Sequence, residues 1–298
     1  MINGLIRGTM SVVLKILDLM TMVKFSHTVF ALPFALMGAT LASLVSGVAP
    51  TLMQILWICL AMVGARTAAM SMNRIIDAQI DAKNPRTATR HIPTGTISRF
   101  EAFMFAGVSI LLLLISAWML NPLCLKLSPI ALFFLILYSY CKRFTFLAHI
   151  VLGLCLAAAP VGAWIALRGD IGWPAIVLGL AVLFWVAGFD IFYALQDLDF
   201  DRETGLFSIP SQFGVERSLI FVRLFHTAMV LLLLALLLLP GLGWIYLFGV
   251  AVVAVLLVYE HKLVKPDDLS RLDAAFFNMN GYISVLIFCF TLADALIV

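Results

Sequence analysis

The chain of 298 residues is 63% hydrophobic and only 12% charged, and its mean hydropathy is +1.10. A soluble domain carries roughly 25% charged residues, so this composition excludes a soluble enzyme, a disordered protein and a secreted disulfide scaffold. The net charge of +3 is too small to indicate a nucleic-acid partner, and we expect no obligate protein partner. The surface of a protein with this composition is mostly apolar, so we expect it to face the lipid bilayer.

A transmembrane helix needs about 20 mostly apolar residues, and nine windows of the chain qualify, of which the fourth is short. They are 25–47, 51–73, 100–120, 126–141, 147–168, 173–195, 216–239, 241–260 and 274–297. The windows are too long and too continuously apolar for the alternating strands of a β-barrel. We therefore predict that residues 1–298 form a single all-α, multi-pass membrane domain, with an amphipathic helix over 1–20 lying on the membrane surface.

Basic residues indicate the orientation of this domain. Fifteen of the 19 Lys and Arg residues precede the first window or fall in the connections on the same side of the membrane. By the positive-inside rule that side is cytoplasmic. We therefore expect a protein of the cell inner membrane with a cytoplasmic N-terminus, and cytoplasmic active-site loops at 76–99 and 196–215.

Two acidic motifs open these two loops, each with a pair of Asp residues four positions apart, and the pairs are 120 positions apart. Positions four or seven apart share a helix face, because each residue turns the helix by about 100°. One face carries Arg66, Asn73, Asp77 and Asp81, and the other carries Asp190, Asp197 and Asp201. Asp199 points away from the second face. We interpret the pattern as a weak internal duplication that places four carboxylates around one cavity.

Carboxylates at this spacing suit a hard divalent cation, and Mg²⁺ is commonly shared between carboxylates and substrate phosphates. We therefore predict Mg²⁺ as the cofactor and a polyanionic substrate. Arg86 and Arg90 follow the first motif, and Tyr138 and Lys142 share a face at the end of the fourth window. We expect Lys142 to reach a phosphate. Its neighbour Arg143 is interpreted as a membrane-surface anchor.

Three ionisable side chains lie apart from the motifs. Asp190 lies two turns inside an apolar run, where a carboxylate is costly unless it faces a wet cavity or a partner. His27 and His149 are lone histidines near helix ends, for which a structural role is the simpler interpretation.

A secondary transporter is the main alternative from these residues, because nine spans, a possible repeat and an intramembrane Asp are compatible with one. The acidic motifs lie at cytoplasmic helix ends and not at the midplane, which favours an enzyme.

The motifs resemble those of the UbiA superfamily of intramembrane prenyltransferases. That family has an NxxxDxxxD motif after its second span and a DxxxD motif after its sixth, on nine helices around a central cavity. The stretch 81–95 resembles the family's DxxxxRTxxRPxPxG pattern, and 138–145 resembles its YxxxKRxT pattern. Two positions depart from the family: His91 replaces a common Pro, and Phe207 stands where relatives often carry Lys or His.

Segments 24–33 and 188–201 resemble the branch labelled 4-hydroxybenzoate polyprenyltransferase-like. This branch includes enzymes proposed to prenylate a dihydroxynaphthoate in the futalosine route to menaquinone. The resemblance implies Mg²⁺-dependent transfer of a polyprenyl group from a polyprenyl diphosphate to an aromatic acid, 4-hydroxybenzoate or a dihydroxynaphthoate, in ubiquinone or menaquinone biosynthesis. Other enzymes of this fold use a haem precursor, a chlorophyll precursor or a lipid headgroup as acceptor, and the sequence does not choose among them.

The resemblance also implies roles for single residues. The implied ligands of Mg²⁺ are Asn73, Asp77, Asp81, Asp197 and Asp201. The implied substrate-binding residues are Lys24, His27, Arg66, Asn73, Arg86, Arg90, Tyr138, Lys142 and Tyr193. Basic groups among them would stabilise the departing diphosphate, and aromatic faces would stabilise an allylic cation. Asp190 is implied to orient the acceptor or to take its proton.

Overall fold

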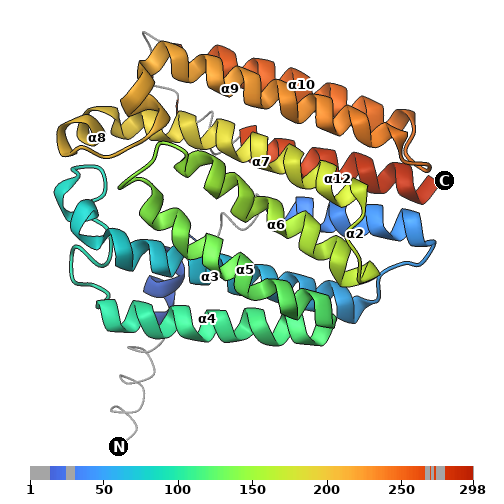
Figure 1. Ribbon diagram of the computed structural model, residues 1–298, viewed down its shortest axis with the longest axis horizontal. Coiled ribbons are helices and arrows are strands. Elements are labelled where there is room, and N and C mark those ends of the chain that lie inside the picture. The colour runs from blue at the N-terminus through green and yellow to red at the C-terminus, as the bar shows by residue number, and fades with distance from the viewer. Residues whose placement is uncertain (1–13, 25–30, 266–268, 270–271, 273–278, 298) are drawn as a thin grey trace, which may run out of the picture.

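The computed structural model describes residues 14–24, 31–265, 269, 272 and 279–297. Most of this part of the chain is helical, and the long helices lie side by side along one axis (Figure 1). In chain order they are α2 (Leu32–Ser46), α3 (Leu52–Lys83), α4 (Arg99–Leu120), α5 (Pro122–Cys141), α6 (Ala148–Arg168), α7 (Trp173–Ala194), the 3₁₀ turn η2 (Leu195–Asp197), α8 (Leu198–Thr204), α9 (Ile209–Ala235), the 3₁₀ turn η3 (Leu236–Leu238), α10 (Trp244–Leu263) and α12 (Asn280–Ile297). Residues 14–22 form a further helix.

Eight helical segments in the described residues are long and apolar enough to cross a membrane, and each overlaps one of the predicted windows. The remaining window, 25–47, overlaps α2, which has 15 described residues, and its positions 25–30 lie outside the described part of the chain. The fourth window was predicted as short, but α5 has 20 residues and includes Pro129. The all-α, multi-pass membrane architecture is confirmed.

Local sequence signals explain where several helices begin. Thr51 and Gln54 form a reciprocal capping box at the start of α3, and Ser98 and Glu101 form another at the start of α4. The Asn121 side chain accepts a hydrogen bond from the first turn of α5, and its amide group also donates to a carbonyl near the end of α6 at 2.7 Å. Polar residues between the spans therefore fix both the ends and the neighbours of these helices.

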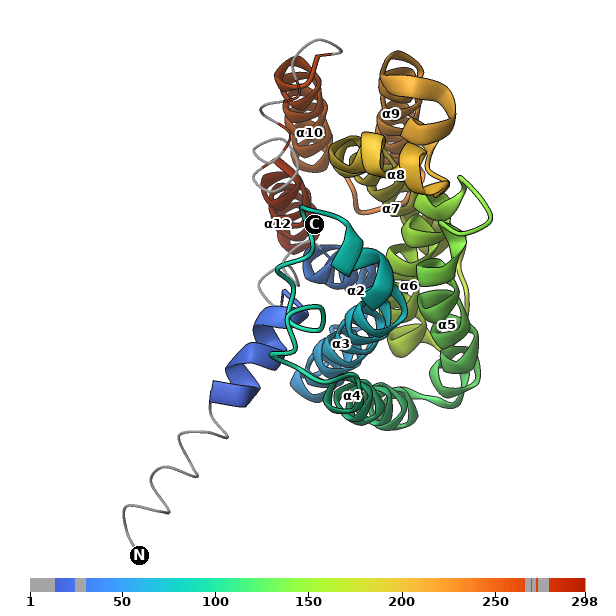
Figure 2. The ribbon, with the colours of Figure 1, turned by 90° about the vertical axis from the view of Figure 1, so that its left-hand side faces the viewer.

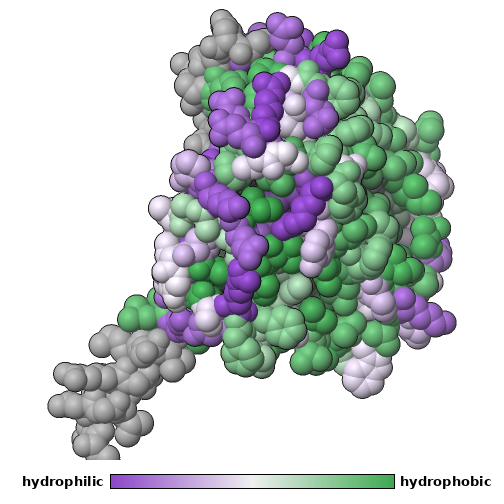
Figure 3. All heavy atoms as spheres, turned by 60° about the vertical axis from the view of Figure 1, so that its left-hand side comes forward, coloured by the Kyte–Doolittle hydropathy of each residue, from purple (hydrophilic) through white to green (hydrophobic). Residues whose placement is uncertain are grey.

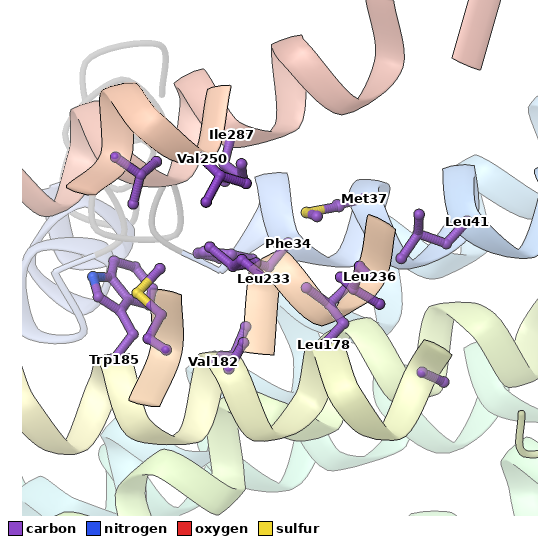
Figure 4. Close-up of a cluster of buried hydrophobic side chains, with 14 of the residues drawn as sticks. Phe34, Met37, Leu41, Leu178, Val182, Trp185, Leu233, Leu236, Val250 and Ile287 are labelled. Carbon is purple, nitrogen blue, oxygen red and sulfur yellow. The ribbon is translucent and has the colours of Figure 1, made fainter. Parts of the chain in front are cut away.

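The largest buried apolar cluster joins α2, α6, α7, α9, α10 and α12, and Figure 4 shows part of it. The ring centres of Phe34 in α2 and Trp185 in α7 are 4.9 Å apart, and both side chains are fully buried. Helix α2 also approaches α6 closely at Gly38, which has no side chain. A Cβ atom at this position would lie only 2.3 Å from the carbonyl oxygen of Pro160. This packing fixes α7, the helix that carries Asp190 and leads into the second acidic motif.

Helix α8 and the connection 84–98 lie at one end of the bundle (Figure 1), and hydrophilic residues gather on this end (Figure 3). Seen from this end, α2 lies inside the bundle and the helix 14–22 projects from it (Figure 2). Met22 and Val23 are buried against the start of α4, and Lys15 forms an ion pair with Glu101 at 2.9 Å. The amphipathic helix predicted over 1–20 is described only from residue 14, and its placement on a membrane surface stays a prediction.

Candidate active site

The two acidic motifs lie on helix ends that face each other across a cavity of about 270 Å³. Helix α3 continues to Lys83, so the first motif occupies its last turns, although the sequence placed it in a loop from residue 76. The second motif follows α7 through η2 into α8. The cavity is lined by all five predicted carboxylates, Asp77, Asp81, Asp190, Asp197 and Asp201.

Asp77 is buried and accepts hydrogen bonds from three side chains. Its Oδ2 atom lies 2.7 Å from Lys142 Nζ and 3.0 Å from Asn73 Nδ2, and its Oδ1 atom lies 3.0 Å from an Arg143 guanidinium nitrogen. The same guanidinium donates to the Ile76 carbonyl at 2.9 Å. The interpretation of Arg143 as a surface anchor is therefore wrong, because its charge is directed to a buried carboxylate.

Asp81 is buried one turn further along α3. Its Oδ1 atom lies 2.7 Å from an Arg90 nitrogen, whereas its Oδ2 atom is buried without a hydrogen-bond partner, 3.9 Å from the nearest Arg74 nitrogen. The Thr87 hydroxyl donates to the Asp81 carbonyl at 3.0 Å and so holds the connection 84–98 over this carboxylate. A buried carboxylate oxygen without a partner is costly unless a ligand completes its coordination.

Asp197 is bound by two residues of the connection 84–98, which follows the first motif. The Arg86 guanidinium donates to both of its carboxylate oxygens, and the Asn84 amide donates to Oδ1 at 2.7 Å. Arg86 also donates to the Tyr193 hydroxyl at 2.6 Å. Burial alone would lower the pKa of Arg86, but the bonds to Asp197 and Tyr193 outweigh it and raise that pKa above its usual value. The guanidinium therefore joins the two motifs while fully charged.

Asp201 and Asp199 differ in the way that helical phase predicts. Asp201 lines the cavity and accepts a hydrogen bond from the Ser208 hydroxyl at 2.9 Å. Asp199 is exposed and is not among the residues that line the cavity. The predicted difference in direction is confirmed, even though η2 interrupts the α-helix before these residues.

Asp190 has a partner that sequence reasoning missed. The His149 Nδ1 atom lies 2.7 Å from Asp190 Oδ2, and the Ile209 backbone N–H donates to His149 Nε2 at 3.2 Å. The depth of Asp190 indicated that it needs a partner, but no spacing rule connects it to a histidine on another helix. His149 belongs to the wall of the cavity, so the purely structural interpretation of this residue is incomplete.

A second, apolar cavity of about 540 Å³ lies among α3, α4, α5, α6 and α7. It shares six lining residues with the polar cavity, namely Arg66, Met70, Asn73, Tyr138, Leu152 and Leu156. The Arg66 Nε atom is buried there without a hydrogen-bond partner. The two cavities therefore meet at a boundary that carries Arg66 and Tyr138.

The N-terminal segment also contributes to the polar cavity. Lys24 lines it and has a positive φ of 48°, and burial lowers the pKa of its ammonium group. The Met22 carbonyl accepts a bond from Arg74 Nε at 3.4 Å, which ties this segment to α3. His27, predicted to bind substrate, lies outside the described residues.

The two departures from the family pattern lie in different places. Phe207 lines the polar cavity, and its backbone N–H donates to the Lys142 carbonyl at 2.8 Å. His91 is not among the lining residues. The cavity keeps basic side chains from the other predicted positions, Lys24, Arg66, Arg86, Arg90 and Lys142.

Within the described ranges, no three His, Cys, Asp or Glu side chains converge closely enough to hold a metal ion. Three of the four motif carboxylates are instead paired with Lys or Arg, and the fourth is paired with a serine. The donors are nevertheless those that Mg²⁺ prefers, since they are carboxylate oxygens and one of them, Asp81 Oδ2, is buried without a partner. The residues present therefore fit Mg²⁺.

Comparisons with known proteins agree on one family. A family model described as the UbiA prenyltransferase family matches residues 31–282. A protein named 4-hydroxybenzoate octaprenyltransferase from Vibrio campbellii is 31% identical over 229 residues, which cover 74% of this chain and 78% of that protein. One of the same name from Nitrosospira multiformis is 31% identical over 232 residues, covering 78% and 79%.

Solved structures agree with the fold. The apo structure of a UbiA homolog from Aeropyrum pernix K1 matches with a TM-score of 0.81 and 34% identity, and covers 90% of this chain and 98% of that one. A UbiA homolog from Archaeoglobus fulgidus bound to DMAPP and Mg²⁺ matches with a TM-score of 0.74 over 94% and 100% of the two chains. The second match is 20% identical and shows the fold alone.

Proposed function

The chain belongs to the UbiA prenyltransferase family and is an enzyme that transfers a prenyl group, and on this premise we propose its substrates. The donor is a polyprenyl diphosphate, and the acceptor is an aromatic acid of quinone biosynthesis, either 4-hydroxybenzoate or a dihydroxynaphthoate. The relatives named 4-hydroxybenzoate octaprenyltransferase support the first acceptor.

One observation carries this proposal: a polar, charged cavity and an apolar cavity share a wall at Arg66 and Tyr138. A polyprenyl diphosphate has the same division, with a charged head and a long hydrocarbon tail. The head occupies the polar cavity between the acidic motifs, and the tail occupies the apolar cavity. The bond between head and tail then lies at the boundary between the two cavities.

The basic side chains bind the diphosphate. Lys142, Arg86 and Arg90 now lie against Asp77, Asp197 and Asp81, and they move toward phosphate oxygens when the donor enters. Arg66 and Lys24 add positive charge at the boundary and at the N-terminal edge of the cavity. These groups oppose the negative charge that grows on the leaving diphosphate.

The acidic motifs hold the predicted Mg²⁺, with Asn73 beside Asp77 on α3. When bound, Mg²⁺ neutralises the diphosphate and makes it a better leaving group. The Asp81 Oδ2 atom has no hydrogen bond to give up on binding a cation, which makes it the first candidate ligand. A homolog of the same fold, from Archaeoglobus fulgidus, is bound to DMAPP and Mg²⁺.

Tyr138, Tyr193 and Asp190 act on the carbon atoms that react. The carbon–oxygen bond of the donor breaks, its electron pair leaves with the diphosphate, and the faces of Tyr138 and Tyr193 stabilise the allylic cation. A ring carbon of the acceptor then forms the new bond. Asp190 takes the proton from that ring carbon, and the electron pair of the carbon–hydrogen bond restores the aromatic ring.

The proposal includes the cellular setting. The protein lies in the inner membrane with its N-terminus and both acidic motifs on the cytoplasmic side, where water-soluble acceptors are available. The excess of basic residues on that side supports this orientation. Family membership leaves the transporter alternative without support. The test below distinguishes the proposed acceptors from others, such as a haem precursor.

The test uses the purified protein in detergent with geranyl diphosphate, Mg²⁺ and a panel of acceptors, and measures product and released pyrophosphate. We expect prenylated 4-hydroxybenzoate or dihydroxynaphthoate, formed in equal amounts with pyrophosphate. Product only from a haem precursor, a chlorophyll precursor or a lipid headgroup would contradict the proposed acceptor. Absence of pyrophosphate release with every acceptor would contradict the proposed reaction.

A further inference from the structure

We propose that His149 is a positioning residue, which holds the Asp190 carboxylate as the proton acceptor of the transfer. This inference rests on the proposed function, since it assigns the machinery that removes the proton from the acceptor. It concerns a contact between α6 and α7 that lies apart from the two acidic motifs.

Hydrogen bonding fixes the tautomer of the imidazole. The Ile209 N–H points at His149 Nε2 at 3.2 Å, so Nε2 accepts a bond and carries no proton when the ring is neutral. The proton of the neutral ring is therefore on Nδ1, where it donates to Asp190 Oδ2 at 2.7 Å. A donor at this position holds the carboxylate in one orientation and leaves Oδ1 available to the acceptor.

Burial makes the arrangement rigid and assigns the roles. Both side chains belong to the wall of the polar cavity, but that of His149 is only 3% exposed, whereas that of Asp190 is 15% exposed. The carboxylate is thus the group that a substrate reaches, and the imidazole lies behind it. His149 cannot itself take the proton at Nε2 without losing the bond from Ile209, so we assign it no direct contact with substrate.

The same corner of the fold connects Asp190 to the second acidic motif. Ser208 caps α9 and its hydroxyl donates to Asp201 Oδ2 at 2.9 Å. The next residue, Ile209, supplies the N–H that orients His149. Two adjacent residues at the start of α9 thus fix the proton acceptor relative to a carboxylate of the diphosphate site.

The chemistry balances with the imidazole neutral throughout. As the ring carbon loses its hydrogen, the electron pair of that bond returns to the ring and the proton passes to the Asp190 carboxylate. The Nδ1–H of His149 keeps its bond to the other oxygen, which sets the angle at which the carboxylate meets the acceptor. Loss of this donor leaves the acceptor bound but its proton poorly aligned.

Two substitutions separate the two nitrogen atoms of His149. In His149→Asn the side-chain amide retains a donor near the Nδ1 position and loses the acceptor for Ile209. In His149→Gln the carbonyl retains an acceptor near the Nε2 position and loses the donor to Asp190. If His149 positions Asp190, we expect the Asn variant to stay within a few-fold of wild type and the Gln variant to lose kcat on the order of 10²-fold.

Two readouts separate this role from a merely structural one. The binding of a non-hydrolysable thio-diphosphate analogue and the KM for the acceptor should change little in either variant. An acceptor deuterated at the reacting ring carbon should show a larger isotope effect on kcat in His149→Gln than in the wild type. A Gln variant as active as the Asn variant, with an unchanged isotope effect, would overturn the proposal.

A double-mutant cycle gives a second, independent test. Because His149 acts through Asp190, adding His149→Gln to Asp190→Asn should cost no further activity, whereas independent roles give additive losses. Additive losses would overturn the inference and leave the proposed function intact. Failure of the wild type to release pyrophosphate would instead contradict the proposed function itself, so the two failures are distinguishable.

Discussion

The two acidic motifs have the same spacing but different surroundings. In the first motif, the side chains of Asp77 and Asp81 are 2% and 5% exposed, on an unbroken helix. In the second, Asp197 is 17% exposed and is the last residue of the 3₁₀ turn η2. Lys142 and Arg143, which follow α5, and Arg90 of the connection 84–98 form ion pairs with the first motif. Arg86 of the same connection forms the ion pair with Asp197 of the second motif.

This asymmetry teaches that a repeated motif does not make two equal half-sites. In the first motif, both carboxylates are buried and form ion pairs with Arg90, Lys142 and Arg143, so their positions change little unless those ion pairs break. The second depends on a guanidinium that belongs to the connection 84–98. We therefore expect the first motif to set the position of the diphosphate, and the second to respond to the state of that connection.

The largest effect should come from removing the divalent cation, because this affects both motifs at once. Treatment with EDTA should abolish pyrophosphate release, and added Mg²⁺ should restore it. Four carboxylates and a diphosphate repel each other unless cations lie between them. Full activity in EDTA would contradict the assignment of these carboxylates to a metal.

Asp77→Ala should follow, with a loss of turnover of about 10³-fold. This substitution removes a candidate ligand and leaves Lys142 and Arg143 without their buried partner. Steady-state release of pyrophosphate measures the loss, and thermal unfolding in detergent serves as the control for folding. Turnover within ten-fold of the wild type would show that the first motif does not set the position of the diphosphate.

Arg86→Gln should reduce turnover by about 10²-fold, because it removes the charge that joins the two motifs. The matched control is Arg86→Lys, which keeps a positive charge but cannot donate to both oxygens of Asp197 at once. We expect the Lys variant to recover part of the activity. Equal activity of the Gln variant and the wild type would show that the second motif does not depend on Arg86.

The smallest effect should come from Asp199→Asn, whose turnover should stay within about two-fold of the wild type. Substitutions of exposed residues outside a binding site usually have small effects. Asp199 is exposed and points away from the cavity. The comparison is with Asp201→Asn, which changes a lining carboxylate on the same helix. Equal losses for the two variants would contradict the phase of α8.

Much of this site was predictable because helical phase and burial act on single residues. Phase placed Asp77, Asp81 and Asn73 on one face of α3, and hydropathy located the spans. The partners of the carboxylates were not predictable, since they come from separate segments. Arg143 follows α5 and His149 lies in the first turn of α6, and only tertiary packing brings them to Asp77 and Asp190.

The bounds of the predicted loops show the same limit. Apolar content ends near residue 73, but α3 continues to Lys83 because the buried carboxylates of Asp77 and Asp81 find basic partners there. Those partners make ten further residues stable as helix where hydropathy alone ends the span. Ion pairs across the bundle therefore extend the spans beyond what composition indicates.

Binding of a donor analogue tests most directly whether the two motifs form one site. Titration of a geranyl thio-diphosphate analogue with Mg²⁺ should show one saturable site in the wild type. Asp77→Ala and Asp197→Ala should each weaken binding, and the double variant should bind no more weakly than the worse single variant, because both act on one bound diphosphate. Full additivity of the two losses, or unchanged binding in either single variant, would contradict a shared site.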